Sequence, residues 1–591
     1  MEADLLAVDT ETTGLNVTTG EDYLTGISIA FYRGDEIIST YFPFNHVDVN
    51  VDQDVKKAVK ALIENASALV FHHAKFDIPS LRTVGITISP EQFFYDTMLM
   101  AHLIDENRPF TGKGLDSLAR YYLRVTTGKE KSDILKLYTE TPGWGWRMVP
   151  AFVMYHYACV DAELTLRLCS VLIERLKKEA TDEMWSHKQQ LVHVLDSMKT
   201  NGVLVSEKRI QYLINEGERE MARASAELGG IIPSSPLQLK KFLIDDLGLP
   251  VLLWTKPAKG KNPADHIPKP SFAKSVMPEY EALLEERFPG DTKVQNILTY
   301  RGWQKSIGFL RSWLALRSPD GRLRPNFVMH KDPDDGGTVT GRLSCREPNL
   351  QQIPRQSSKP WANRLKACFI PQEGYVLVEA DYSQLELRLA TAYAKEASLR
   401  MVFDEGRDIF DEMSTRLGIT RDACKTFVYA TQYGAGDRKI AASLGISVGA
   451  AKQIRNDYLA AYPGFAAFSY KKEVSVRNYG KVGIWSGRFR HFLDPDQEAR
   501  KAMNSVIQGG AADIVERVMV NCWDRFSKDN PDCRMVLQIH DAIVFEIKVE
   551  KLSYYLDLIR DTMEGVNEYV YDFKVKFAVD GHKLGTKEKL W

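Results

Sequence analysis

Acidic residues at the ends of predicted strands are the groups of this chain best placed to do chemistry. Asp381 directly follows an apolar, β-branched stretch at 374–380, which predicts a strand that delivers its carboxylate to the strand end. Asp9 and Glu11 end a second such stretch, and their spacing of two places both side chains on one face. Two carboxylates on one face repel each other unless a cation lies between them. The pair of Asp9 and Glu11 is therefore predicted to hold a divalent cation. Asp381 is also well placed to hold a cation beside a substrate phosphate, but from this position alone an exposed Asp in a turn is the favoured alternative.

Two further acidic positions extend the N-terminal set. Asp77 closes the segment 73–77, and Asp161 follows Tyr157 by four residues, which places phenol and carboxylate on one face of a predicted helix. Four carboxylates and a tyrosine can hold two metal ions and orient a water for phosphodiester hydrolysis. This pattern predicts a hydrolytic two-metal site in the first 170 residues.

Cationic and aromatic residues recur every four positions in the C-terminal half of the chain. Arg421, Lys425 and Tyr429 fall within about 80° of arc on a helix, so all three can face one site, and Tyr433 continues the spacing. Two cations and an aromatic ring on one helix face suit a triphosphate with a base stacked beyond it. An amphipathic surface helix is the alternative.

The elements that must position these residues follow from the local pattern. The segment 534–546 predicts two strands joined at His540 and Asp541, which brings a further carboxylate to a strand end. The leucine and alanine spacing after Asp381 predicts a helix packed on the preceding strand. Helical spacing at 191–198 is followed by Asn201-Gly202, which predicts a helix end there.

The composition indicates a globular chain of several domains. Its 591 residues are too many for one core, so roughly three or four domains are expected. Hydrophobic residues make up 44% and charged residues 26%, and no apolar run approaches the roughly 20 residues of a membrane span. The N-terminus lacks a basic and then apolar signal segment. The seven cysteines are scattered without a Cys-x-x-Cys pair, which favours reduced thiols in a cytosol-like compartment. A formal net charge of -1 gives DNA binding no support but leaves room for a local basic groove.

Several segments resemble one known family. The octapeptide at 381–388 (DYSQLELR) resembles motif A of family A DNA polymerases, the DNA polymerase I-like group. The series of Arg421, Lys425, Tyr429 and Tyr433-Gly434 resembles motif B, and 534–546 resembles motif C. The segments at 337–354 and 500–509 resemble two further elements of the family. The resemblance covers nearly the whole chain, with the motifs in the family's order.

The resemblance implies a role for each matching polymerase residue. The metal ligands would be Asp381, the backbone carbonyl of Tyr382, and Asp541. Arg421 and Lys425 would grip the triphosphate, with Lys425 also a proton donor to the leaving pyrophosphate. Arg342 would touch the primer-terminal base pair in the minor groove, where acceptors lie at similar places in every base pair. The other residues assigned to the nucleotide are Gln384, Glu386, Tyr429, Tyr433 and His540, and those assigned to DNA are Arg301, Lys305, Arg311, Arg500, Asn504 and Gln508. Glu386 would crowd a 2′-OH and so exclude ribonucleotides, with a plain salt bridge as the alternative.

The N-terminal residues resemble the proofreading 3′→5′ exonuclease of the Asp-Glu-Asp-Asp class with a tyrosine in its third motif. This implies metal-ligand roles for Asp9, Glu11, Asp77 and Asp161, and a water-orienting role for Tyr157. Thr12 and Leu15 would contact the 3′ nucleotide. The Asp96-Thr97 pair is expected to be a helix cap, with substrate contact as the alternative. A decayed exonuclease kept as a scaffold is the alternative.

Three positions depart from the family pattern. His73 stands where the second exonuclease motif usually opens with Asn, Phe410 where a His usually adds a phosphate contact, and Ala542 where motif C usually has Glu. We expect altered nucleotide contacts from His73 and modestly weaker nucleotide binding from Phe410. Ala542 is expected to change only the tuning of the site, because Mg²⁺ needs few protein carboxylates.

The predicted fold is a multidomain α/β chain in which an RNase H-like exonuclease precedes a right-hand polymerase. The expected domains are the exonuclease at 1–170, a mainly helical thumb at 171–320, a first part of the palm at 321–400, fingers at 401–484 and a second part of the palm at 485–591. No 5′-nuclease domain is expected.

The predicted function is template-directed DNA polymerisation by two-metal phosphoryl transfer, with 3′→5′ proofreading. The alternatives are a dedicated 3′→5′ exonuclease whose polymerase-like half only holds DNA, and a non-catalytic binding module. Two Mg²⁺ ions per active site are expected, with Mn²⁺ as a substitute, and the expected partners are primer–template DNA and deoxynucleotides. We further expect a monomer without membrane contact or an evident processivity partner, in the cytoplasm of a bacterium or of a phage-infected host.

Overall fold

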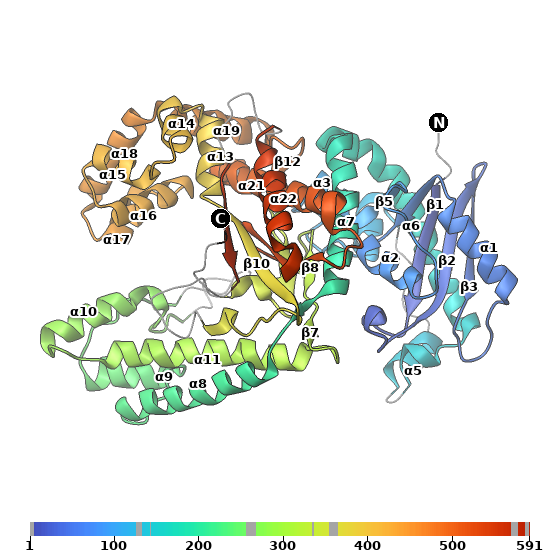
Figure 1. Ribbon diagram of the computed structural model, residues 1–591, viewed down its shortest axis with the longest axis horizontal. Helices are drawn as coiled ribbons and strands as arrows, with labels where there is room; N and C mark the ends of the chain where they lie inside the picture. Colours follow the sequence, from blue (N-terminus) through green and yellow to red (C-terminus); the bar gives the residue numbers. More distant parts are fainter. Residues whose placement is uncertain are drawn as a thin grey trace.

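The computed structural model describes residues 5–125, 133–141, 144–255, 267–333, 336–353, 364–568, 577–584 and 590. Figure 1 shows one sheet with its helices at the N-terminal end of the molecule, a second sheet near the centre, and two helical bodies beyond that second sheet. The chain is thus a mixed α/β structure of several bodies, as the sequence predicts.

The N-terminal sheet has five strands in the order β3 (Glu36–Pro43), β2 (Leu24–Arg33), β1 (Leu5–Thr12), β4 (Ala68–Phe71) and β5 (Phe94–Asp96). The central strand β1 pairs antiparallel with β2 and parallel with β4. Leu6, Ala7 and Val8 are buried, so an apolar strand carries the chain to Asp9 as predicted. The helices of this body are α1 (Gln53–Glu64), α2 (Ala74–Arg82), α3 (Thr97–Ile104), α4 (Leu115–Leu118), α5 (Asp133–Glu140) and α6 (Ala151–Glu179).

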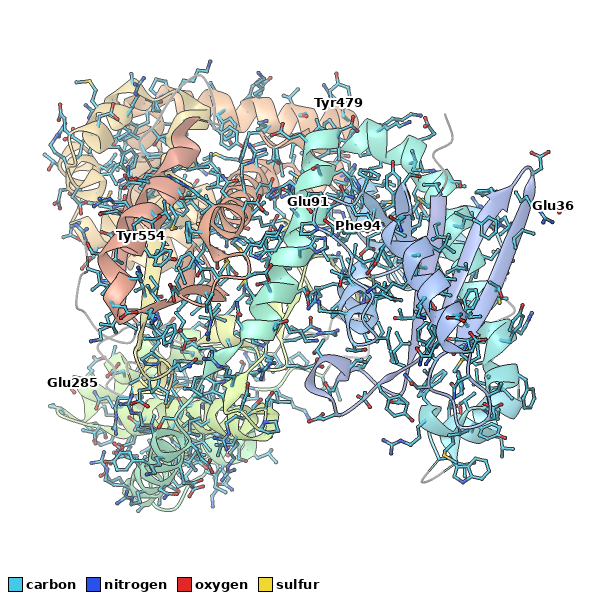
Figure 2. All side chains as sticks on the ribbon, turned by 45° about the vertical axis from the view of Figure 1, so that its right-hand side comes forward. Glu36, Glu91, Phe94, Glu285, Tyr479 and Tyr554 are labelled. Carbon is cyan, nitrogen blue, oxygen red and sulfur yellow. The ribbon has the colours of Figure 1, made fainter. Side chains whose placement is uncertain are left out.

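The long helix α6 packs against β1, β2 and β3. It runs without a break through residue 170, where the first domain boundary was expected. The next helix, α7 (Asp182–Asn201), links this body to the central sheet. Near its start the Trp185 indole donates to the Phe94 carbonyl over 3.3 Å, and at its end Asn201 donates to the Met535 carbonyl over 3.1 Å. Figure 2 shows Phe94 beside this helix.

Two long helices, α8 (Glu207–Glu227) and α11 (Lys293–Leu316), lie side by side and project from the central sheet (Figure 1). They approach closely at Gly217, where a Cβ atom would lie 2.5 Å from the Trp303 ring. At their far end α9 (Pro236–Leu239) and α10 (Met277–Arg287) enclose a separate small core around Tyr280 and Leu284.

The central sheet has the order β13 (Cys533–Ile539), β14 (Ala542–Lys548), β10 (Tyr375–Tyr382) and β15 (Val579–Lys583). β13 and β14 are joined at His540-Asp541, which confirms the predicted pair of strands. The predicted helix after Asp381 is α13 (Leu385–Ala394). It packs mainly against other helices, α21 (Ala502–Cys522) among them, and not mainly on the preceding strand as the sequence predicts. α22 (Leu552–Glu564) contacts α21 and the strands β10 and β14.

A run of helices between β10 and β13 forms the second helical body (Figure 1). It comprises α14 (Ala397–Asp404), α15 (Ile409–Leu417), α16 (Arg421–Gln432), α17 (Asp437–Leu444), α18 (Val448–Ala461) and α19 (Pro463–Tyr479). The Thr420 hydroxyl caps α16 by accepting the Ala423 N–H over 3.3 Å, which fixes where this helix begins.

Short elements join the larger bodies. They are β6 (Val203–Leu204), β7 (Arg322–Leu323), β8 (Asn326–Val328), β9 (Ser344–Arg346), β11 (Lys481–Gly483), β12 (Phe489–His491) and α20 (Pro495–Glu498). Among the helices in the described ranges, none combines the length and the apolar character that crossing a bilayer requires.

Candidate active sites

Three carboxylates converge where β1 meets α6. The ligand oxygens of Asp9, Glu11 and Asp161 lie within 4.8 Å of one another, and Glu11 and Asp161 are buried. Alternation along β1 places Asp9 and Glu11 on one face, as the spacing predicts. Carboxylates this close in a buried place repel unless they share a cation, so this set of oxygens fits a divalent metal ion.

Asp77, the fourth predicted ligand, does not join this group. Its Oδ1 atom accepts hydrogen bonds from the Thr10 hydroxyl over 2.7 Å and the Thr10 N–H over 3.2 Å. The Thr10 side chain lies on the face of β1 opposite to Asp9 and Glu11. Burial, with a smaller contribution from the charge of Asp96, raises the pKa of Asp77 to about 8. Its Oδ2 atom is buried and accepts no hydrogen bond from the described residues, so it still has an oxygen to offer a cation.

Tyr157 lies one turn before Asp161 on α6, as predicted. Burial, followed by the negative charges of Asp161 and Glu11, raises the pKa of this phenol, so it keeps its proton and remains a hydrogen-bond donor beside the carboxylates. At the other side of the site the Thr12 hydroxyl donates to the Gly14 carbonyl over 2.8 Å, and Leu15 is exposed.

His73 takes the left-handed backbone conformation, with φ of +78°, immediately before α2. Asn and His are among the few residue types other than glycine that are enriched in this conformation. Asn and His both suit this backbone, so the departure changes mainly the side chain, whose ring lies 6.1 Å from that of His330. Asp96 accepts the Met98 and Leu99 N–H groups as the cap of α3, which confirms its expected role as a helix cap.

Asp381 and Asp541 lie at adjoining strand ends of the central sheet. The Tyr382 N–H donates to the Asp541 carbonyl over 3.4 Å and ties the two ends together. Asp381 stands between Ala542 of β14 and Asp580 of β15, and residues directly opposite each other share one face of a sheet. Two carboxylates and the Tyr382 carbonyl are oxygen ligands of the kind that Mg²⁺ takes in proteins. Sequence reasoning missed Asp580, because its position opposite Asp381 depends on long-range pairing.

Arg342 lies between Glu386 and the carboxylate of Asp541 in this second site. It forms an ion pair with Glu386 and lies 3.8 Å from Oδ1 of Asp541. The Tyr433 hydroxyl donates to the other Glu386 oxygen over 3.3 Å. Burial raises the pKa of Glu386 although Arg342 opposes the shift. The salt bridge considered as the alternative role of Glu386 is thus present. Arg342, Asp541 and His540 also line one cavity of about 40 Å³.

Arg421, Lys425 and Tyr429 all lie on the face of α16 that meets Phe410, so the predicted common face exists. Tyr433 follows the last residue of this helix. Arg421 Nη2 donates to the Asp408 carboxylate over 2.5 Å.

The residues assigned to DNA differ in how accessible they are. Arg301 donates to the carbonyls of Pro233 over 2.9 Å and of Phe272 over 2.5 Å, so its guanidinium holds two loops near α9 and α10. Lys305 is exposed, with its ammonium 5.5 Å from the Phe309 ring centroid. Arg311 is also exposed and pairs with Glu218 over 2.7 Å.

Arg500, Asn504 and Gln508 lie at and after the start of α21, with Arg500 exposed and the other two half-buried. The end of α16 approaches this segment at Gly434, whose φ is +70° and whose added Cβ would lie 2.7 Å from the Arg500 carbonyl oxygen. Glycine is the residue that such a backbone and such an approach require. Two non-glycine residues with positive φ, Gln384 and His540, flank Asp381 and Asp541.

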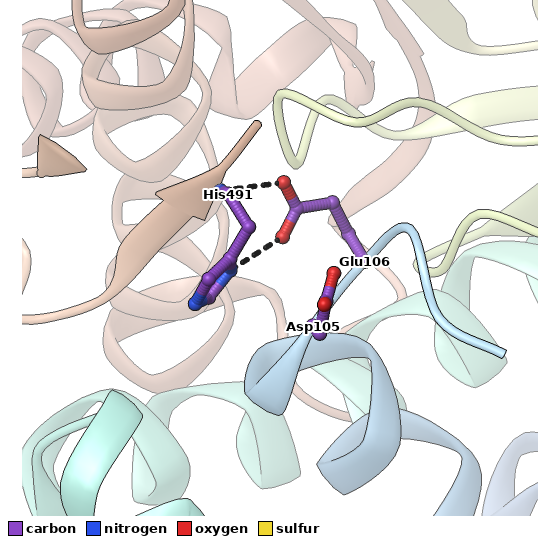
Figure 3. A group of neighbouring side chains, drawn as sticks. All are labelled: Asp105, Glu106 and His491. Atoms are coloured by element: carbon purple, nitrogen blue, oxygen red, sulfur yellow. Dashed lines mark hydrogen bonds and ion pairs between the residues drawn. The ribbon is translucent and has the colours of Figure 1, made fainter. Parts of the chain in front are cut away.

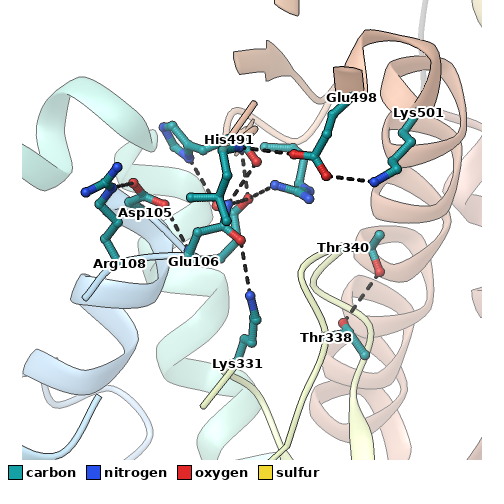
Figure 4. Close-up of polar contacts among 12 residues, drawn as sticks. Asp105, Glu106, Arg108, Lys331, Thr338, Thr340, His491, Glu498 and Lys501 are labelled. Carbon is teal, nitrogen blue, oxygen red and sulfur yellow. Dashed lines mark hydrogen bonds and ion pairs between the residues drawn. The ribbon is translucent and has the colours of Figure 1, made fainter. Parts of the chain in front are cut away.

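A third group, Asp105, Glu106 and His491, has ligand atoms within 4.8 Å of one another (Figure 3). Glu106 accepts hydrogen bonds from the guanidinium of Arg490, from the His491 N–H over 2.8 Å and from the ring Nδ1 over 3.0 Å. The other ring nitrogen lies 3.2 Å from Glu179. Protein groups thus occupy these atoms, and the cluster is an ionic junction between the N-terminal body and β12 (Figure 4). The sequence carries no local pattern that would reveal it.

Comparisons with known proteins agree with this geometry. The chain is 30% identical to DNA polymerase I of Pseudomonas aeruginosa over 95% of its own length and 62% of the relative's. It is 31% identical to the thermostable DNA polymerase I of Thermus aquaticus over 72% of its own length and 51% of the relative's. The chain therefore spans about three fifths or less of the length of these relatives.

The solved structure of the POL domain of Pol1 from M. smegmatis, in complex with DNA primer-template and dNTP, has the same fold. The TM-score is 0.77 at 22% identity, over 99% of this chain and 95% of that one. Residues 1–177 match the family model described as 3′-5′ exonuclease. Residues 205–587 match the model described as DNA polymerase family A, which confirms the predicted class and family. The chain belongs to DNA polymerase family A.

Proposed function

We propose that the chain is a template-directed DNA polymerase that proofreads its product with a 3′→5′ exonuclease. The observation that carries the proposal is the meeting of Asp381 and Asp541 at two strand ends, in a chain whose N-terminal body holds a separate group of three carboxylates. The N-terminal body would be the exonuclease, the helices α8 to α11 the thumb, the central sheet the palm, and the helices α14 to α19 the fingers. On this basis we propose the domain ranges expected from the sequence, with the first boundary moved from residue 170 to the end of α6 at Glu179.

In the polymerase site Asp381, Asp541 and the Tyr382 carbonyl would hold two Mg²⁺ ions. Bound metal would activate the primer 3′-OH and neutralise the triphosphate. Arg421 and Lys425 would bind the triphosphate by charge, which raises the affinity for the anionic nucleotide. Glu386, held by Arg342 and Tyr433, would lie beside the sugar and exclude a 2′-OH.

In the exonuclease site Asp9, Glu11 and Asp161 would hold metal, with Asp77 as a further ligand after its carboxylate turns or loses its proton. Bound metal would lower the pKa of an attacking water and stabilise the negative charge that develops on the phosphate oxygens during hydrolysis. Tyr157 would orient that water with its phenol, because its raised pKa keeps it a donor. Leu15, whose side chain is exposed, would contact the terminal base.

The proposed working form is a monomer in the cytoplasm, with no processivity partner evident from the sequence. The seven cysteines support a reducing compartment, because all are buried and free. The proposed partners are primer–template DNA and deoxynucleotides.

A primer-extension assay with Mg²⁺ tests the proposal. We expect extension to the end of the template with all four deoxynucleotides, and shortening of the primer from its 3′ end when they are left out. Shortening without extension would identify a dedicated exonuclease, and neither reaction would identify a binding module. With Arg421 and Lys425 on one face of α16, we expect extension.

A further inference from the structure

One buried ring lies beside all three residues of α16 that are proposed to bind the nucleotide. Phe410 lies in the first turn of α15 and is 2% exposed. The guanidinium carbon of Arg421 is 5.8 Å, and the ammonium nitrogen of Lys425 is 6.0 Å, from the centroid of its ring. The ring of Tyr429 is 5.8 Å away and tilted by 50°.

These distances place both cations within reach of the ring's negative face. A cation within about 6 Å of an aromatic centroid is attracted by the ring quadrupole, and Arg and Lys are the usual cations. Arg421 and Lys425 are themselves exposed, so each retains a side that a solvent-borne anion can approach. A phenylalanine has no hydrogen to donate to a phosphate, but it can hold two cations and one aromatic ring in a fixed relation.

The position of Phe410 is itself fixed by Asp408, which joins α15 to α16. Asp408 Oδ1 accepts the N–H groups of Phe410 over 2.7 Å and of Asp411 over 3.1 Å, as the cap of α15. Its Oδ2 atom accepts Arg421 Nη2 over 2.5 Å. One carboxylate therefore sets both the first turn of α15 and the first residue of α16. The Phe410 ring is buried at the junction of α15 and α16. It therefore cannot turn away from α16 unless the two helices separate.

We infer that Phe410 is a positioning residue of the nucleotide site: its ring arranges Arg421, Lys425 and Tyr429 before the nucleotide binds. The inference rests on the proposed polymerase function and assigns to Phe410 a role different from the phosphate contact that a histidine makes there. Long cationic side chains that are ordered in advance lose less conformational freedom when a triphosphate arrives, so affinity rises. The ring contact with Tyr429 places the phenol in the same arrangement.

The test is single-nucleotide insertion kinetics with the full chain and Mg²⁺. Phe410→Leu removes the ring and keeps an apolar side chain, and we expect KM for the deoxynucleotide to rise by about 5- to 30-fold, the effect of losing two cation–ring contacts. We expect kcat to fall by a smaller factor than KM rises, because Asp381 and Asp541 stay in place and only Lys425, the expected proton donor, is disturbed among the residues of the chemical step. Phe410→Tyr keeps a ring face and should restore KM to within about threefold of the original value.

Phe427→Leu is the matched control. Phe427 is a buried phenylalanine on α16 itself, and its ring packs 5.4 Å from that of Tyr458. We expect KM to stay near the original value in this variant. A KM unchanged in Phe410→Leu would overturn the inference. So would an equal rise of KM in Phe427→Leu, or a fall of kcat in Phe410→Leu with KM unchanged.

Folding is checked by 3′-end shortening of single-stranded DNA, which uses residues of the other body, and by thermal melting. Should Phe410→Leu fail to fold, ring-fluorinated phenylalanines at position 410 keep the shape and weaken the negative face of the ring. A KM that rises with each added fluorine supports the inference, and a flat series overturns it. If the unsubstituted chain extends no primer, the proposed function is refuted. If the unsubstituted chain extends primers but KM is the same in all variants at position 410, only the role of Phe410 is refuted.

Discussion

Glu106→Gln tests the junction that joins the N-terminal body to β12. Glu106 is 4% exposed, and it accepts bonds from the Arg490 guanidinium, the His491 N–H and the His491 ring (Figure 3). The Arg490 side chain is buried as well. The amide would keep the size of the side chain and one acceptor oxygen, but it would leave Arg490 buried without its anion.

The expected cost is large because the pair is buried. Removing the charge of one partner of a buried ion pair costs about 3–5 kcal/mol, since the other charge stays desolvated. Because one acceptor oxygen remains, we expect a loss of about 3 kcal/mol in the free energy of unfolding, measured by urea denaturation. Asp54→Asn is the control, because Asp54 pairs with Lys57 over 3.1 Å at an exposed place where ion pairs contribute only ~0–1 kcal/mol.

The pH dependence gives a second measure of the same junction. Burial opposes protonation of His491, but the bond to Glu106 and the charges of Glu106, Asp105 and Glu179 outweigh it and raise the pKa above 6.5. A raised pKa stabilises the fold fully below pH 6.5, and this stabilisation is lost as pH rises through the raised value. Burial likewise opposes ionisation of Glu106, but the His491 bond and the Arg490 charge lower its pKa below 4.5, so its contribution is lost on acidification.

We therefore expect the stability of the original chain to fall as pH rises above 6.5, and Glu106→Gln to flatten that fall. A loss of stability no larger than that of Asp54→Asn would refute the reasoning. An unchanged pH dependence in Glu106→Gln would show that the His491 pKa is raised by other groups.

Three variants test the two sites. Asp541→Ala should abolish primer extension and leave 3′-end shortening intact, and loss of both in a folded protein would contradict the separation of the sites. Asp9→Ala combined with Glu11→Ala should stop 3′-end shortening and leave extension of matched primers, so continued trimming of mismatched ends would place the exonuclease site elsewhere. Tyr429→Phe should raise discrimination against dideoxynucleotides at least tenfold in kcat/KM. The phenol can replace the missing 3′-OH as a donor to phosphate, and one bond to a charged acceptor is worth about 1.5–3 kcal/mol, or roughly 10- to 150-fold. An unchanged ratio would leave Tyr429 with base stacking alone.

Local pattern was enough to predict the elements that carry the catalytic candidates. The strands β1 and β10, the pair β13 and β14, and the face of α16 all follow from periods of two or of about 3.6 residues. The end of α7 at Asn201 follows from the Gly202 that succeeds it. Such patterns show on which face of a strand or helix a side chain lies, but they do not show which residue it contacts in the fold.

The features that sequence reasoning missed are contacts between distant segments. Asp77 bonds Thr10 across a sequence separation of 67, and His491 bonds Glu106 across 385. The closeness of Phe410 to Arg421 and Lys425 was missed for a related reason, because the position was interpreted only by comparison with the histidine usually found there. The three-dimensional packing of the whole chain decides which distant residues meet. A local sequence period shows which face a side chain leaves from, but not which residue it contacts.

The two sites share no residue, but ion pairs made by α7 connect the bodies that carry them. On α7, Lys188 pairs with Glu516 of α21, and both side chains are nearly inaccessible. Asp196 of the same helix pairs with Arg82 of α2, in the N-terminal body. Opening the interface would expose or orphan these charges, and orphaning a buried one costs about 3–5 kcal/mol. These contacts of α7 therefore keep the two sites at a fixed separation. Under the proposed function, the primer 3′ end must then move from one site to the other.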